Sequence, residues 1–172
     1  MNVFLVGPMG SGKSAVGRQL AQRLDLDFID SDAEIEARTG VDIAYIFERE
    51  GEAGFRSREA EVIDALSRRD RVLVSTGGGA ILDASTRERL RARGRVVYLR
   101  TSVDQQLART RRSNDRPLLN NDDPRGTLER LFEQRAPLYA EVAEIVVDTD
   151  GRKVKAVVDQ ICHQLGIDGV EP

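Results

Sequence analysis

The sequence predicts an α/β fold in which helices cover both faces of a parallel sheet, and two patterns carry that prediction. Short, almost continuously apolar runs alternate along the chain with longer segments of helical periodicity. Parallel strands buried on both faces read as such runs, and a crossover helix joins each strand to the next. Five runs qualify as strands: Val3–Val6, Leu26–Ile29, Val72–Ser75, Val96–Leu99 and Ile145–Val147.

The helical segments between these strands follow in order. Val16, Leu20 and Leu24 are spaced by four residues and place one apolar stripe on a helix after the first strand. Residues 32–67 predict a long helical insertion, interrupted at Gly40 and around residues 51–54. Residues 111–123 are polar and irregular, which is typical of a lid, and Asp123 with Pro124 is expected to begin the next helix.

Length and composition predict a single domain spanning residues 1–172. The chain is 40% hydrophobic and 32% charged, as ordinary globular proteins are. A net charge of -3 gives no reason to expect nucleic acid or an anionic membrane as a partner. The sequence has no signal-peptide pattern and no run long enough to span a membrane, and one cysteine suits a reducing compartment. We therefore expect a cytoplasmic protein.

Residue usage also narrows the chemistry. The only histidine, His163, follows the only cysteine, Cys162, in a C-terminal amphipathic segment. Nucleophilic triads and zinc sites are therefore poorly supported, and we expect Cys162 in the core and His163 at the surface. Arginine outnumbers lysine 23 to 3, and through residue 152 the only lysine is Lys13. A compact ammonium is therefore indicated at that position.

Lys13 belongs to a phosphate-binding motif. Residues 7–14, GPMGSGKS, match G-x-x-x-x-G-K-[ST] between a predicted strand and a predicted helix. In that motif backbone N–H groups cradle phosphates, the lysine reaches the β- and γ-phosphates, and the Ser14 hydroxyl binds magnesium. The alternative is a glycine-rich turn without a ligand, which the full match in this context disfavours. No N-K-x-D base-reading motif accompanies it, so adenine is favoured over guanine.

A second set of residues predicts a site for the phosphate acceptor. Arg56 precedes most of an apolar helical stripe and could project into a cleft. Residues 77–79 are three successive glycines after a strand, which suits close approach of backbone to a ligand, although a flexible turn is the alternative. Asp30 and Asp32 end the second strand, and a metal, a basic side chain, a substrate or a helix cap at Asp32 would each account for them.

Taken in order along nearly the whole chain, these motifs resemble those of shikimate kinases. The resemblance depends on their combination rather than on any one of them. It comprises the phosphate loop, Asp30-Ser-Asp32, Arg56-x-x-Glu59-x-x-x-Ile63, residues 73–79 (LVSTGGG), residues 116–119 (RPLL) and residues 135–139 (RAPLY).

This resemblance implies a P-loop NTPase fold like that of nucleoside monophosphate kinases, a three-layer α/β/α arrangement with five strands in the order 2-3-1-4-5. It implies transfer of the ATP γ-phosphate to the 3-hydroxyl of shikimate, in aromatic amino-acid biosynthesis, by a monomer that uses Mg²⁺. Residues 32–67 would then be the acceptor-binding insertion and residues 111–123 the lid. The alternatives are a gluconate or nucleoside monophosphate kinase of the same fold, and a nucleotide-dependent switch.

Site residues are carried over by position. The catalytic residues would be Lys13, Asp32 and Arg116, although a base role for Asp32 does not follow from sequence. Ser14 and Asp30 would hold the metal, Asp30 through a water. The acceptor residues would be Asp32, Arg56, Gly77, Gly78, Gly79 and Arg135. The nucleotide residues would be Gly10, Ser11, Gly12, Lys13, Ser14, Ala15, Arg109, Arg116 and Arg152.

Simpler interpretations remain for some of these residues. Arg109 and Arg116 could belong, like Arg111 and Arg112, to a solvated face, and Arg135 could lie on an exposed helix surface. Ala15 replaces the threonine of many related phosphate loops, which removes a hydroxyl from the α-phosphate. We expect this to change ATP affinity modestly.

Overall fold

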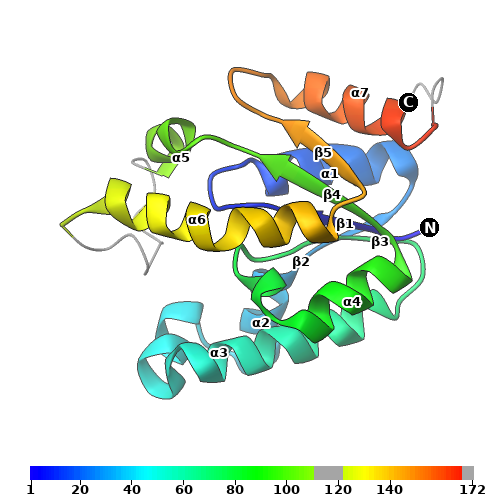
Figure 1. The fold of residues 1–172 in the computed structure, drawn as a ribbon. Coiled ribbons are helices and arrows are strands. Elements are labelled where there is room, and N and C mark those ends of the chain that lie inside the picture. Colours follow the sequence, from blue (N-terminus) through cyan, green and yellow to red (C-terminus); the bar gives the residue numbers. More distant parts are fainter. Residues whose placement is uncertain (111–121, 168–172) are drawn as a thin grey trace.

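A five-stranded parallel sheet forms the centre of the computed structural model, which describes residues 1–110 and 122–167 (Figure 1). The sheet order is β2-β3-β1-β4-β5, and every neighbouring pair is parallel. The order expected from the family resemblance is therefore confirmed. The strands are β1 (Val3–Val6), β2 (Asp27–Asp30), β3 (Val72–Ser75), β4 (Arg95–Arg100) and β5 (Ile145–Asp148).

Helices cover both faces of the sheet, as predicted. Alternate side chains of β1 enter different cores: Val3 and Leu5 pack with α1 and α7, whereas Phe4 and Val6 pack with α3, α4 and α6. Figure 1 shows α1 and α7 together on one side of the sheet and α3 with α4 on the other. The helices are α1 (Lys13–Leu24), α2 (Ser31–Thr39), α3 (Ile43–Ser67), η1 (Ala80–Leu82), α4 (Ala84–Arg93), α5 (Val103–Thr110), α6 (Pro124–Val142) and α7 (Val154–Gln164).

The two edge strands depart from the uniformly apolar pattern. Val146 in β5 is 37% exposed, and Asp27 at the start of β2 is exposed as well. By contrast, all four residues of β1 and of β3 are buried. Complete burial therefore holds for these inner strands, because an edge strand has a neighbour on one side only and is covered less fully.

The predicted interruptions of the insertion are confirmed. α2 ends at Gly40 with a left-handed φ of 73°, and α3 contains a non-helical residue at Gly51, with φ of 71°. A left-handed φ suits glycine because it has no Cβ. Asp123 caps α6 by accepting a hydrogen bond from Gly126 N at 3.0 Å, and Pro124 begins that helix. Both expectations for this helix start are confirmed.

One predicted helix start is wrong. The alternative that Asp32 caps a helix from Ala33 does not hold, because α2 already begins at Ser31. The cap is Asp30, whose Oδ1 accepts a hydrogen bond from Ala33 N at 3.1 Å. Asp32 lies in the first turn of α2, so its carboxylate does not serve as the cap.

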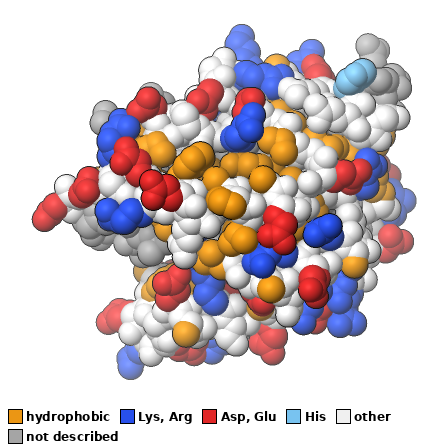
Figure 2. Space-filling view, viewed as in Figure 1, with side chains coloured by type: hydrophobic (Ala, Val, Ile, Leu, Met, Phe, Trp, Pro, Cys, Tyr) orange, Lys and Arg blue, Asp and Glu red, His pale blue; other side chains and the backbone are white. Residues whose placement is uncertain are grey.

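The surface and the C-terminal helix agree with the composition. In the view of Figure 2, acidic and basic side chains are interspersed over the face rather than separated by sign. Cys162 is 4% exposed in the core of α7, and His163 is exposed, both as predicted. Across residues 1–110 and 122–167, no helix has the length and apolarity that a membrane span requires.

Candidate active site

The phosphate loop and the predicted acceptor residues meet at one edge of the sheet. The carboxyl ends of parallel strands share an edge, and β1, β2 and β3 each end in one of the predicted motifs. Between them lies a cleft of about 420 Å³. Its lining comprises residues 9–15 from the phosphate loop, Asp30, Asp32, Ser75, Thr76, Gly77, Gly78, Arg109 and Thr110.

The phosphate loop presents backbone to this cleft. Gly10 and Gly12 have left-handed φ values of 74° and 86°, which turn the chain tightly before α1. Gly12 occupies the N-cap position of α1 and has no side chain with which to cap it. The first N–H groups of α1 therefore point towards an anion site, where the helix dipole adds positive potential.

Lys13 already lies over its own loop. Its Nζ donates hydrogen bonds to Gly7 O at 2.6 Å and Pro8 O at 2.8 Å. These bonds hold the ammonium beside the glycine-rich loop, and phosphate oxygens are stronger acceptors than carbonyls for a charged donor. The Lys13 ammonium thus lies beside the expected phosphate position before a nucleotide binds.

Ser14 and Asp30 form the pair predicted to hold a metal. Ser14 Oγ lies 3.4 Å from Asp30 Oδ2, while Asp30 Oδ1 caps α2. A hydroxyl with one carboxylate matches the donor set of Mg²⁺, which keeps several waters and takes further oxygens from phosphates. Within the described part of the chain, no group of three or more His, Cys, Asp or Glu side chains is arranged as a metal cage, which agrees with so sparse a set.

Arg56 of α3 and Arg135 of α6 lie against the triple glycine, although neither is among the residues that line the cleft. Arg56 Nη1 donates to Glu59 Oε1 at 2.8 Å, and Nη2 lies 3.6 Å from Glu52 Oε1. Arg135 is only 4% exposed, and a Cβ built on Gly78 would lie 3.5 Å from its Nη1. The alternative that Arg135 lies on an exposed helix surface is therefore wrong.

Glu59 is a member of this cluster that we did not predict as a site residue. Glu59 is 2% exposed, and the pKa of its carboxyl is raised to about 7, mainly by burial. The Asp32 charge also raises this pKa, and the charges of Arg56 and Arg135 lower it. The sequence did carry a signal, because residues at i and i+3 share a helix face, as Arg56 and Glu59 do. Its burial depends on tertiary structure and was not visible.

The triple glycine is tightly packed, so an open flexible turn does not describe it. Gly77 N donates to Ser31 Oγ at 3.1 Å, and the Tyr139 hydroxyl donates to Gly78 O. A Cβ built on Gly77 would lie 2.7 Å from Glu59 Oε2 and 2.9 Å from Asp32 Oδ1. The absence of side chains here allows two carboxylates to approach the backbone.

The arginines predicted to contact the nucleotide lie in different parts of the structure. Arg109 Nη1 donates to Gly10 O at 2.9 Å and lines the cleft, so the solvated-face interpretation does not fit it. Arg152 does not line the cleft; it donates to Asp148 O at 3.0 Å and Ala156 O at 3.2 Å, beside β5 and α7. Its contact with adenine stays a prediction. Arg116, with Arg111 and Arg112, lies outside the described residues.

Gln106 is a further residue that the sequence did not reveal. It is 2% exposed, and its Nε2 donates to Met9 O at 2.9 Å. Together with Arg109 it attaches α5, which precedes the predicted lid, to the phosphate loop by two hydrogen bonds. No motif marks this glutamine.

Comparison with known proteins shows which family shares this fold and these site residues. The family model described as shikimate kinase matches residues 9–166. A shikimate kinase of Shewanella frigidimarina is 58% identical over 165 residues, covering 96% of each chain. One of Alteromonas mediterranea is 55% identical over 166 residues, covering 96% of this chain and 97% of the relative. The solved shikimate kinase of Acinetobacter baumannii in complex with shikimate is 46% identical, with a TM-score of 0.94 over 99% of this chain and 95% of that one.

Proposed function

The chain belongs to the shikimate kinase family, and from this premise we propose how its cleft transfers the γ-phosphate of ATP to the 3-hydroxyl of shikimate. The products are shikimate 3-phosphate and ADP. One observation carries the assignment of the site: a single cleft of about 420 Å³ is lined by the phosphate loop and by the acidic and glycine residues of the acceptor side. Donor and acceptor can therefore bind side by side in one cleft.

The nucleotide occupies the phosphate-loop end in this proposal. Backbone N–H groups of residues 10–15 hold the phosphates, and Lys13 moves from the carbonyls of Gly7 and Pro8 to the β- and γ-phosphates. Ser14 and Asp30 would hold Mg²⁺, which would supply positive charge to neutralise the phosphates. Arg109 borders the nucleotide from α5, and Arg152 is assigned to the adenine end.

Shikimate occupies the other end, where its chemistry matches the side chains. Its carboxylate pairs with the guanidinium groups of Arg56 and Arg135, which recognise planar anions with paired donors. Its hydroxyls donate to Asp32 and accept from the N–H groups of residues 77–79. The contacts of the glycines with Glu59, Asp32 and Arg135 support this placement, because they put all these groups around one loop.

Phosphoryl transfer in such a site depends mainly on position and charge neutralisation, because the transition state is loose. Lys13 supplies charge on the phosphate side, and Arg116 supplies it from the lid at residues 111–123. Asp32 accepts the proton of the attacking hydroxyl. Closure of the lid excludes the water that would otherwise hydrolyse ATP. We further propose that the chain acts as a cytoplasmic monomer, with residues 1–172 as one domain and residues 32–67 as its acceptor-binding insertion.

The test is ADP release coupled to a spectroscopic readout, with ATP and Mg²⁺ held constant and shikimate, gluconate or AMP as acceptor. We expect ADP release to depend on shikimate. Turnover stimulated by gluconate or AMP alone would overturn the proposal, and ATPase activity indifferent to every acceptor would favour a nucleotide switch.

The role of Arg56 is tested separately, with Arg58→Ala as the matched control on the same helix. Arg58 is 44% exposed and pairs with Glu50, whereas Arg56 lies against Gly79, so the loss of Arg58 should leave turnover intact. Arg56→Ala should abolish shikimate-dependent turnover and leave ATP affinity nearly unchanged. If both decline equally, Arg56 serves the phosphates instead.

A further inference from the structure

The acceptor end of the cleft is electrically balanced before the acceptor arrives. Arg56 and Arg135 each carry one positive charge, and Asp32 and Glu59 each carry one negative charge when ionised. These groups come from α2, α3 and α6, and they lie around the triple glycine: Asp32 and Glu59 at Gly77, Arg135 at Gly78 and Arg56 at Gly79. A bound carboxylic acid adds a further negative charge to this buried cluster, and an uncompensated buried charge is costly.

Glu59 is the group of this cluster best placed to accept a proton. Its Oε1 accepts from Arg56 at 2.8 Å, but its Oε2 is buried and has no hydrogen-bond partner among the residues that the structure describes. That unpartnered oxygen lies against Gly77, on the side where Asp32 Oδ1 also approaches. Burial already brings the pKa of Glu59 to about 7, so near pH 7 a substantial fraction of the molecules carry a neutral Glu59.

The acceptor's carboxylate would favour the neutral form further, for two reasons. It competes with Glu59 for the guanidinium of Arg56, which is the nearest charge that lowers the Glu59 pKa. It also adds a like charge close to Glu59, and like charges within a few ångströms disfavour ionisation of a carboxyl.

Resting on the proposed function, we propose that Glu59 takes up one proton from solvent when the carboxylate of shikimate binds between Arg56 and Arg135. The proton forms an O–H bond at Oε2, and no other bond is made or broken. The five groups then carry no net charge: two guanidinium cations, the Asp32 and shikimate carboxylates, and a neutral Glu59. The Asp32 carboxylate, which also approaches Gly77, is left to the acceptor hydroxyls.

The coupling has a predictable sign and size. Binding that takes up a proton weakens as pH rises, from below the pKa of the free site to above it. Because shikimate raises the Glu59 pKa above its value of about 7 in the free chain, the dissociation constant of shikimate increases above pH 7, by at most about tenfold per pH unit. Proton uptake is then at most about half a proton at pH 7, where half of the free sites are already protonated, and at most about 0.9 at pH 8.

Titration calorimetry of shikimate binding, in buffers of different ionisation enthalpy at pH 7 and pH 8, measures this uptake directly. We expect a positive slope of observed enthalpy against buffer ionisation enthalpy in the wild-type chain. Glu59→Gln keeps a polar partner for Arg56 and removes the titrating group, so the slope should fall to near zero. The dissociation constant should then change less than about twofold between pH 6 and pH 8.

Two matched controls separate Glu59 from other groups. Glu52 is the second carboxylate beside Arg56, and its side chain is largely exposed. Glu52→Gln should therefore leave the proton uptake unchanged. His163→Gln removes the only histidine, an exposed side chain on α7, and should also leave it unchanged. The circular-dichroism melting curve of each variant confirms its fold. If Glu59→Gln does not fold, a zero slope in the wild-type chain or a slope lost in His163→Gln still rejects the proposal.

Three outcomes would overturn the proposal. A zero slope in the wild-type chain, with shikimate still bound and phosphorylated, rejects proton coupling and leaves the proposed function intact. An uptake that persists in folded Glu59→Gln, or that disappears in His163→Gln, assigns the proton elsewhere and rejects the role of Glu59. Absence of both shikimate binding and shikimate-dependent ADP release rejects the inference together with the function on which it rests.

Discussion

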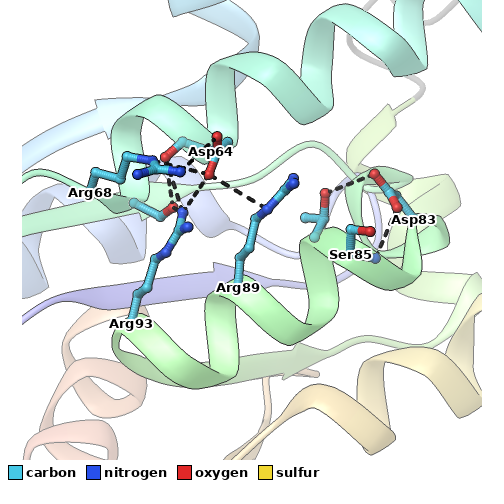
Figure 3. Close-up of polar contacts among 8 residues, drawn as sticks. Asp64, Arg68, Asp83, Ser85, Arg89 and Arg93 are labelled. Carbon is cyan, nitrogen blue, oxygen red and sulfur yellow. Dashed lines mark hydrogen bonds and ion pairs between the residues drawn. The ribbon is translucent and has the colours of Figure 1, made fainter.

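Two carboxylates of helix α3, Glu59 and Asp64, are each close to arginines, and yet their pKa values shift in opposite directions. Asp64 is joined to Arg68, Arg89 and Arg93, with Arg93 Nη1 at 2.6 Å from Oδ1 (Figure 3). The Arg93 hydrogen bond and the other arginines hold the pKa of Asp64 below its ordinary value. The pKa of Glu59 rises to about 7, although Arg56 and Arg135 are near.

The difference shows that burial outweighs the number of cationic partners. Water and guanidinium groups stabilise the Asp64 carboxylate together at the surface, where α3 meets α4 (Figure 3). Glu59 has lost its water, and two arginines do not fully replace it. The Asp64 cluster joins α3 to α4. The Glu59 cluster, with Asp32, Arg56 and Arg135, instead holds charges whose balance a ligand can change.

The largest effect should come from removing a cation of each cluster. Arg135→Ala is expected to lower kcat/KM for shikimate by about 30-fold or more, because a desolvated charge pair typically costs about 2–5 kcal/mol when one partner is lost. Arg93→Ala, at the Asp64 cluster, should leave kcat/KM within about twofold, since neither member of this partly buried pair lines the cleft. Steady-state kinetics at saturating ATP measures both, and similar losses in the two variants would refute the contrast.

The next effect concerns stability and its pH dependence. The folded pKa of Glu59, about 7, lies above the ordinary 4.5, so its contribution to stability is complete below about pH 4.5 and is lost as pH rises through 7. The shift corresponds to about 3 kcal/mol between those limits. Denaturant unfolding of wild type and Glu59→Gln should therefore show the variant gaining relative stability from pH 5 to pH 8. Parallel curves would mean that the buried carboxyl does not titrate in this range.

Gly79→Ala should act on the acceptor site without destabilising the fold. Gly79 has φ of -99°, which any residue adopts, but its Cβ would overlap Arg56 Nη2. The guanidinium can move away, so we expect the melting temperature to change little. The KM for shikimate should rise by about 10-fold, since the arginine is displaced from its paired geometry. An unchanged KM would show that Arg56 reaches the acceptor from another rotamer.

The smallest effect should be that of Asp64→Asn. The pKa of Asp64 is lowered in the folded chain, so its contribution to stability is present above the ordinary value of 3.8 and is lost as pH falls through the folded value. We expect a slight decrease of the melting temperature at pH 7 that salt diminishes and acid abolishes, with unchanged kinetics. A change in shikimate KM would show that the surface cluster acts on the site.

Much of the fold and part of the site could be predicted because the signals are contiguous. The phosphate loop is an eight-residue motif between a strand and a helix, and its geometry follows from local backbone constraints. The five strands were located within one or two residues of their ends. The wrong helix cap arose where two aspartates compete for one helix start, since local pattern alone does not choose between Asp30 and Asp32.

By itself, then, the sequence determined the α/β architecture, the phosphate loop and the acceptor motifs, because each depends on residues close together in the chain. Tertiary structure decided how deeply the charged side chains of those motifs are buried and which charges lie beside them. The burial of Arg135 and Glu59 requires α3, α6 and the triple glycine to converge from distant parts of the chain. A carboxyl's proton affinity depends on the water removed and the charges brought near, and only the folded chain sets both.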